Sequence, residues 1–193
     1  MAAKSLSIIA LVLLMTSCAN ELRSRDKSGS SNREFARVEK KDIDYQEFAF
    51  NDLYSGAKKT FGNLAFGKKL VMVVYFAPWC HNWLHEMSLV ERLYNKYKDA
   101  GFGVIAINEY GPSSETRALF GAPGAPYPVV IESESKNDRT STTHFAYRRL
   151  ADDQRLWGSP WHIFIDQNNE SWVVNGELIE SDIEPFIESK LHG

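Results

Sequence analysis

A continuous apolar run, Leu70–Phe76 (LVMVVYF), constrains the fold more than any other part of the sequence. Its β-branched and aromatic residues, with no charged residue among them, are typical of a strand that is covered on both faces of a sheet. Apolar residues then recur at helical spacing from Cys80 to Tyr97, and a second apolar run, Val104–Ile107, follows. Because two such strands joined by a helix form a right-handed parallel unit, they predict the centre of an α/β sheet.

The remaining chain continues the alternation of strands and helices. Residues 47–53 and 59–64 predict short strands and turns that precede the central unit. Further on, the pattern predicts helices over Ser113–Phe120, Phe145–Leu156 and Ser181–Leu191, and strands over Tyr127–Ile131, Trp161–Asp166 and Ser171–Val174. Only a short turn separates the last two strands, so they should form an antiparallel hairpin. The predicted fold is therefore α/β, with a central mixed β-sheet flanked by helices.

Size and charge narrow the functional classes. The 193 residues are enough for one domain with a sizeable core and an additional tail. The formal net charge is −3, and no segment builds a basic stripe. These features argue against a nucleic-acid partner.

The N-terminal residues predict an export signal with a lipidation site. The apolar run Leu6–Met15 follows a short positive start and is too short to span a bilayer, which takes about 20 residues. The residues Met15–Cys18 (MTSC) resemble a bacterial lipobox, in which similar proteins are cut before the cysteine and carry the lipid on it. We therefore expect a lipoprotein signal peptide at residues 1–17 and lipidation of Cys18. A plain signal peptide that is cut nearby is the alternative.

This reading sets the expected domain boundaries and location. Residues 18–41 are polar and Ser-rich, so they predict the lipidated cysteine followed by a flexible tether, and residues 42–193 predict the folded domain. We expect a monomer in the bacterial cell envelope that is held to the membrane by its lipid and faces the periplasm. Ala19 after the cysteine resembles lipoproteins sent to the outer membrane, so the outer membrane is favoured over the inner one.

The cysteine content leaves one thiol as the candidate reactive group. The chain has two cysteines, and if Cys18 is lipidated, Cys80 has no partner for an intrachain disulfide. Cys80 lies at a predicted strand-to-helix junction, where the first helical N–H groups and the positive end of the helix dipole favour a thiolate. This position predicts a reactive, partly accessible thiol, and an inert buried cysteine is the alternative.

Two motifs resemble those of thioredoxin-like proteins, in particular the membrane-anchored TlpA/ResA kind. Phe76–Glu86 (FAPWCHNWLHE) is similar to the family stretch F-W-A-x-W-C-x-x-C-x-x-E-x-P, and Gly158–Asp166 (GSPWHIFID) is similar to its G-x-P-x-x-x-x-I-D segment. The resemblance covers residues 43–190. It implies a thioredoxin-like fold, thiol-disulfide exchange at Cys80, and a cis proline at Pro160 that faces the cysteine.

The chain departs from that pattern at Trp83, which stands where the family has its second cysteine. A dithiol site resolves its mixed disulfide with the second thiol, so here an external thiol would have to complete the cycle. Packing under the loop is the plain interpretation of this tryptophan.

Glu86 matches the acidic residue of the family, either as a buried group that exchanges protons with Cys80 or as a solvated carboxylate on the helix face.

The resemblance implies a set of candidate site residues. We expect catalysis from Cys80, Glu86 and Pro160. The expected substrate contacts are aromatic, histidine and backbone groups around the cysteine: Trp79, His81, Trp83, Ser159 and Trp161. The Ser159 backbone would pair with an extended peptide beside Cys80, and Trp79 and Trp161 should both be partly exposed.

Three functional hypotheses follow. The first is an enzyme-like thiol-disulfide oxidoreductase that works through Cys80 alone, with protein thiols, disulfides or extended peptides of the envelope as partners. The second is a non-catalytic thioredoxin-fold module that binds a peptide or protein. The third is copper delivery through Cys80 and nearby histidines, His81, His85 and His162. Under the first two hypotheses we expect no cofactor and no resident metal.

Overall fold

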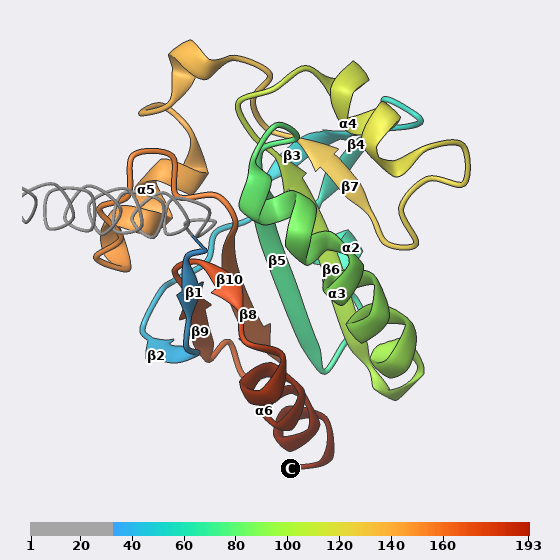
Figure 1. The fold of residues 1–193 in the computed structure, drawn as a ribbon. Helices are drawn as coiled ribbons and strands as arrows, with labels where there is room; N and C mark the ends of the chain where they lie inside the picture. The colour runs from blue at the N-terminus through green and yellow to red at the C-terminus, as the bar shows by residue number, and fades with distance from the viewer. Residues whose placement is uncertain (1–32) are drawn as a thin grey trace, which may run out of the picture. The chain divides into compact units, whose positions relative to one another are not determined.

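The computed structural model of the protein describes residues 33–193. These residues form an eight-stranded sheet in the order β2–β9–β8–β5–β6–β7–β3–β4 (Figure 1). Its strands are β2 (Glu39–Lys41), β3 (Ala49–Asp52), β4 (Lys58–Thr60), β5 (Leu70–Phe76), β6 (Phe102–Asn108), β7 (Val129–Ile131), β8 (Trp161–Asp166) and β9 (Ser171–Val174). A separate parallel pair joins β1 (Phe35–Ala36) to β10 (Glu177–Leu178). The predicted signal peptide and Cys18 lie outside the described residues.

Helices cover both faces of the sheet. They are α2 (Phe61–Ala65), α3 (His81–Tyr97), α4 (Ser113–Phe120), α5 (Thr143–Leu150) and α6 (Glu180–His192). Helices α3 and α6 share one hydrophobic cluster with the sheet, whereas α2 and α5 contribute to a second cluster. None of the helices in residues 33–193 combines the length and apolarity that a bilayer crossing requires.

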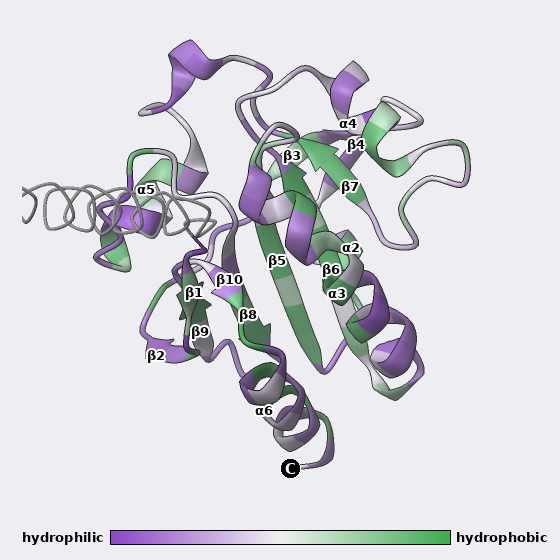
Figure 2. Ribbon diagram, in the orientation of Figure 1, coloured by the Kyte–Doolittle hydropathy of each residue, from purple (hydrophilic) through white to green (hydrophobic). Residues whose placement is uncertain are grey.

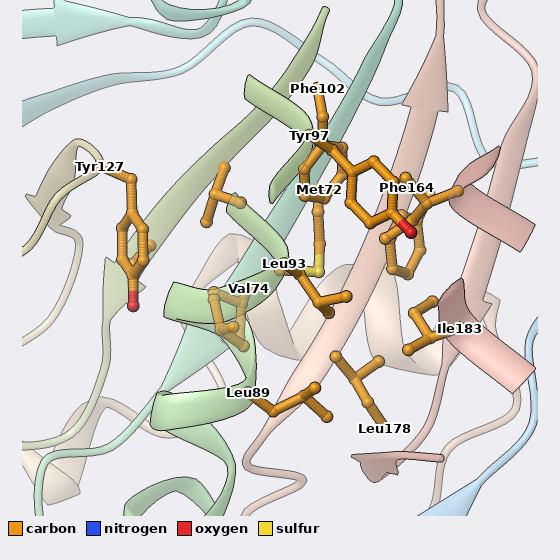
Figure 3. Packing of buried hydrophobic residues seen from close by; sticks show 14 of the residues in the cluster. Met72, Val74, Leu89, Leu93, Tyr97, Phe102, Tyr127, Phe164, Leu178 and Ile183 are labelled. Carbon is orange, nitrogen blue, oxygen red and sulfur yellow. The ribbon is translucent and has the colours of Figure 1, made fainter. Parts of the chain in front are cut away.

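Strand β5 is fully buried because successive side chains enter different clusters. Met72 and Val74 belong to the cluster of α3 and α6, and Val73 and Tyr75 belong to the other. Figure 3 shows the first cluster, in which Leu93 of α3 lies between the strands and α6. Hydropathy follows the same arrangement, with apolar residues concentrated on the central strands and polar residues along the helices (Figure 2). The predicted double coverage of this strand is confirmed.

The topology at the centre agrees with the sequence-based expectation. Strands β5 and β6 are parallel neighbours connected through α3, so the predicted strand–helix–strand unit is confirmed. Strands β8 and β9 pair antiparallel, as the short turn between them predicted. Since β8 also pairs antiparallel with β5, the sheet is mixed. The end of β5, the start of α3 and the start of β8 therefore meet at one edge, where the candidate site lies.

Phe61–Ala65 lies in a segment that was predicted as strand and turn but forms the helix α2. Two predicted boundaries also differ from the structure by six residues or more. The tether was expected to extend to residue 41, but β2 is hydrogen-bonded along β9, and the Ser171 hydroxyl binds backbone groups of Lys41 and Ile43. Strand β2 has the sequence EKK, and such charged strands are common at sheet edges, where hydropathy does not reveal them. Helix α5 was expected to continue to residue 156 but ends at Leu150, because Asp152 has a left-handed φ of 62° and the chain turns there.

Candidate active site around Cys80

Cys80 is the N-cap residue of α3, at the end of the turn that follows β5. Its backbone N–H donates to the Ala77 carbonyl at 2.9 Å, which closes the turn. The Sγ atom lies 3.1 Å from the Ser159 carbonyl oxygen, and its thiol donates a hydrogen bond to it. Cys80 is half-buried, and it is the one free cysteine of residues 33–193. The predicted placement of a partly accessible thiol at the helix start is confirmed.

The loop that faces Cys80 contains the predicted cis proline. The Ser159–Pro160 peptide bond is cis. Besides accepting from the Cys80 thiol, Ser159 accepts a 2.9 Å hydrogen bond from the Ala77 N–H through its Oγ atom. The cysteine loop and the proline loop are therefore joined by two hydrogen bonds that one serine accepts. Ser159 is buried, and the pairing of its backbone with a peptide stays a prediction.

Trp83 is not placed to touch a substrate. Its side chain is fully buried, and its ring stacks on Phe76 with ring centroids 4.6 Å apart. The expectation of a substrate contact here is therefore wrong, and packing under the loop is what the structure shows. The position lies on the inner side of the first turn of α3, so a bulky aromatic residue fills the space against the end of β5.

Trp161 differs from the expectation in a similar way. It was expected to be partly exposed, but it is fully buried and its Nε1 donates to Asn175 Oδ1 at 2.7 Å. As the first residue of β8 it is the partner of Tyr75 on β5, so its ring enters the cluster of α2 and α5. Strand pairing continues closer to the proline than hydropathy alone indicates, and it turns this side chain inward.

Glu86 and His162 form a buried pair beneath the site. Their carboxylate Oε1 and imidazole Nε2 lie 2.6 Å apart, and Glu86 Oε2 accepts from the Leu178 N–H at 2.5 Å. Because both side chains are buried, the alternative of a solvated Glu86 is wrong. The sequence did not indicate this pair, since one partner comes from α3 and the other from β8, and no motif joins them.

The histidines near Cys80 do not converge on a metal site. His162 is engaged by Glu86, while His81 is exposed and its ring centroid lies 4.1 Å from that of His85. No group of three or more histidine, cysteine, aspartate or glutamate side chains within residues 33–193 is placed to hold a metal ion. The copper-delivery hypothesis therefore has no ligand set in the described part of the chain.

Trp79 forms the surface beside the cysteine. It is partly exposed, as predicted, and its Nε1 donates to the Tyr110 carbonyl at 2.9 Å. Its ring meets Trp157 edge to face, with centroids 5.3 Å apart. Trp157 lies in the loop that leads to the cis proline, so the two tryptophans span the two loops of the site.

A buried histidine supports the site from the other face of the sheet. His144 Nδ1 lies 2.9 Å from the Tyr110 hydroxyl, and its Nε2 lies 3.2 Å from the Gly158 carbonyl oxygen. Burial, reinforced by the nearby Arg148 charge, lowers the pKa of His144 well below its ordinary value. The neutral imidazole therefore donates to the Gly158 carbonyl and accepts from Tyr110. Sequence reasoning missed this residue because a lone histidine on a helix carries no motif.

Arg148 anchors the loop between α5 and β8. Its buried guanidinium donates to Asp153 Oδ2 at 3.0 Å, to the Trp157 carbonyl at 3.0 Å, and to the Arg155 carbonyl. Burial opposes ionisation of Asp153, but hydrogen bonds from Arg155 and Arg148 outweigh it and lower the pKa of this carboxyl group. The loop that presents the cis proline is therefore fixed by an ion pair with several hydrogen bonds.

Comparison with known proteins agrees with this geometry. No family model matches the chain. Over 122 residues the chain is 27% identical to the thiol-disulfide oxidoreductase ResA of Geobacillus kaustophilus, and the match spans 63% of each protein. The chain thus matches less than two thirds of the length of that relative.

Solved structures of similar fold carry related descriptions. A thiol:disulfide interchange protein of Chlorobium tepidum has a TM-score of 0.58 at 18% identity, covering 84% of this chain and 99% of that one. A secreted disulfide oxidoreductase of Mycobacterium tuberculosis, homologous to DsbE, has a TM-score of 0.56 at 12% identity, covering 74% of this chain and 95% of that one. The protein is thus a thioredoxin-fold protein that is similar in sequence to a ResA thiol-disulfide oxidoreductase.

Proposed function

We propose that the protein exchanges thiols and disulfides through Cys80 alone, with an external thiol completing each cycle. The observation that carries the proposal is the contact between Cys80 Sγ and the carbonyl of Ser159, which precedes a cis proline. The half-buried thiol lies at a helix N-terminus, and this contact holds it beside the proline loop. The backbone of that loop could guide an extended peptide. The name of the ResA relative supports the same chemistry.

The proposed cycle conserves electrons without a second cysteine. The Cys80 thiolate attacks one sulfur of a substrate disulfide, and the other substrate sulfur leaves as a thiolate and takes up a proton. An external thiol then attacks the Cys80 sulfur of the mixed disulfide and releases the reduced substrate. A second external thiol attacks the sulfur of the first, and Cys80 leaves as a thiolate. Two external thiols thus become one disulfide while the substrate gains two electrons.

The setting of this reaction is also proposed. We infer that Cys18 carries a lipid that holds the protein in the cell envelope, facing the periplasm and with the outer membrane favoured. The lipobox-like Met15–Cys18 and the short apolar run before it support this location. Protein disulfides, protein thiols and extended peptides of the envelope would be the partners, and the protein would act as a monomer.

Reduction of insulin disulfides by dithiothreitol tests the proposal. The wild-type protein should accelerate the reaction weakly, and Cys80→Ser should abolish the acceleration, because the attacking sulfur is lost. Trp83→Cys should raise the rate, since it supplies a thiol at the resolving position of the fold. Equal rates for the wild type and Cys80→Ser would overturn the proposal and leave the peptide-binding module as the better reading.

Trp83→Ser is the matched control for the gain of a thiol. Both substitutions remove the buried ring that stacks on Phe76, so each should lower the free energy of unfolding by about 3–5 kcal/mol, as large core truncations do. Only the cysteine variant should gain reductase activity. If the serine variant gained as much, the increase would reflect a loosened site and not a restored dithiol.

A further inference from the structure

Two cations lie on the aromatic surface beside Cys80. The Lys136 Nζ atom is 4.5 Å from the ring centroid of Trp79, and the Arg139 guanidinium carbon is 5.2 Å from that of Trp157. These four side chains are called here the cationic tryptophan pair. Each tryptophan holds one cation over its ring, and the two rings meet edge to face.

The two rings are held by the same loops that hold the reactive sulfur. Trp79 directly precedes Cys80 and is fixed by its hydrogen bond to the Tyr110 carbonyl. Trp157 is fixed through its own carbonyl, which accepts from the buried Arg148. A peptide that is attached to Cys80 and follows the proline loop would therefore lie within reach of both rings.

The two cations are not held in close ion pairs by the described residues. Neither Lys136 nor Arg139 forms an ion pair with a carboxylate of the described chain. Of the neighbouring carboxylates, Glu134 accepts from the Ser113 N–H, and this hydrogen bond lowers its pKa, whereas Asp138 is solvent-exposed.

The other side of Cys80 adds no negative charge. Helix α3 has no acidic residue in its first turn and presents the exposed His81 and His85 there. The exposed side chains beside the thiol are thus tryptophan, lysine, arginine and histidine, and the neighbouring carboxylates are those of Glu134 and Asp138.

We propose that the cationic tryptophan pair selects extended peptides that carry a carboxylate next to the cysteine attacked by Cys80. This inference rests on the proposed thiol-disulfide exchange and names the class of its substrate. A lysine and an arginine that already lie over aromatic rings keep N–H groups free for a carboxylate, and charge-assisted hydrogen bonds to carboxylates are among the stronger polar contacts. The rings supply an apolar platform for the rest of the peptide.

Three tripeptide probes test this selectivity in the intact protein. In each, a central cysteine carries a 2-thiopyridyl disulfide and is flanked by glutamate, glutamine or lysine on both sides. Cys80 attacks the peptide sulfur and releases pyridine-2-thione, whose absorbance gives the rate. We expect the glutamate peptide to react about tenfold faster than the lysine peptide at low ionic strength, with the glutamine peptide between them.

The double variant Lys136→Glu/Arg139→Glu should reverse this order, so that the ratio of the glutamate-peptide rate to the lysine-peptide rate falls below one. The matched control is Lys58→Glu/Lys98→Glu, which makes the same change in net charge. Lys98 also lies near an aromatic ring, that of Tyr94, but at the far end of α3, about 25 Å away for a helix of this length. This control should keep the wild-type order.

The outcomes separate the inference from the proposed function. Equal rates for the three peptides would overturn the selectivity and leave the exchange reaction in place. Reversal in the control variant would also overturn it, because overall charge and not this surface would then set the order. Absence of reaction at Cys80 with every peptide would overturn the proposed function itself.

Discussion

Glu109, the residue directly after β6, carries a carboxyl group that is fully buried. Neither of its oxygens has a hydrogen-bond partner within residues 33–193, and the nearby Glu132 accepts from the N–H and hydroxyl of Thr143. Burial, and then the nearby Glu132 carboxylate, raise the pKa of Glu109 well above its ordinary value. The buried Glu109 carboxyl group therefore keeps its proton at a pH where an exposed glutamate has lost it.

This pair predicts a pH-dependent stability. Between the ordinary pKa of a glutamate and the raised pKa of Glu109, the folded protein holds a proton that the unfolded chain has released. The free energy of unfolding should therefore fall as pH rises through that window, by up to about 1.4 kcal/mol per pH unit. Glu109→Gln removes the titrating group, so this contribution to the slope should disappear.

Urea unfolding of both proteins from about pH 5 to about pH 9 measures the difference. The variant should gain stability relative to the wild type as pH rises. Glu134→Gln is the control: hydrogen bonds to Ser113 lower the pKa of Glu134, so its contribution is lost only toward acid pH. Parallel curves for the wild type and Glu109→Gln would show that Glu109 is not protonated in the folded state.

At the scale of elements, the loop between α5 and β8 presents the cis proline to Cys80, and Gly158 is its tightest point. This glycine has a φ of 58°, and a Cβ atom added to it would lie 1.8 Å from Arg148 Nε. The backbone here approaches the buried guanidinium so closely that only glycine fits. The carbonyl groups of this loop are the ones that the His144 imidazole and the Cys80 thiol bind.

Gly158→Ala should therefore disturb both stability and the site. Displacing the Arg148 guanidinium would disrupt its buried pair with Asp153, and such losses cost about 3–5 kcal/mol of unfolding free energy. The rate of Cys80 alkylation should also change, because the Ser159 carbonyl would move away from the thiol. Urea unfolding and alkylation with iodoacetamide measure the two effects.

Gly56→Ala provides the matched control for the backbone strain. Gly56 also has a positive φ, 69°, but open space surrounds the position of a Cβ atom. Its substitution should cost only the left-handed penalty of about 1–2 kcal/mol and leave alkylation unchanged. Similar effects from the two alanines would mean that the contact with Arg148 does not matter.

Elements whose own residues carry the signal for their structure were predicted correctly from the sequence. Strands β5 and β9 and helix α4 have the predicted bounds, because apolar runs and helical periodicity report burial that each segment carries in its own residues. The cis Pro160 and the half-buried Cys80 were predicted from local motifs. These features depend on residues that are close together in the chain.

Features that depend on distant partners were not predictable in the same way. The pairing of Glu86 with His162 joins two elements, and neither residue type reveals its partner. Trp161 was expected to be exposed because the motif does not show how far strand pairing extends toward the proline. The charged residues of strand β2 are equally typical of an edge strand and of a flexible segment, so the sequence does not distinguish β2 from tether.

At the scale of the whole molecule, residues 34–41 join the N-terminal end of the domain to its C-terminal part. Strand β2 pairs with β9 and strand β1 pairs with β10, so both segments lie against the last third of the chain. The exposed Glu34–Arg155 pair adds a contact to the loop of the cis proline. The folded unit therefore begins earlier than the predicted residue 42.

A comparison of two truncated chains tests the contribution of these strands. A protein that starts at residue 42 should have a lower free energy of unfolding than one that starts at residue 34, by on the order of 2 kcal/mol for the few lost backbone hydrogen bonds. Thermal unfolding followed by circular dichroism measures the difference. Identical transitions would place residues 34–41 with the tether after all.

The buried Trp83 also bears on how long a substrate stays attached to Cys80. A dithiol enzyme releases its substrate at a rate fixed by its own second sulfur, whereas in the proposed mechanism the adduct on Cys80 persists until a thiol arrives from solution. The residence time of the captured partner would then vary inversely with the thiol concentration of the compartment. A tryptophan that merely fills space would in this way turn the lifetime of a complex into a readout of its reducing environment.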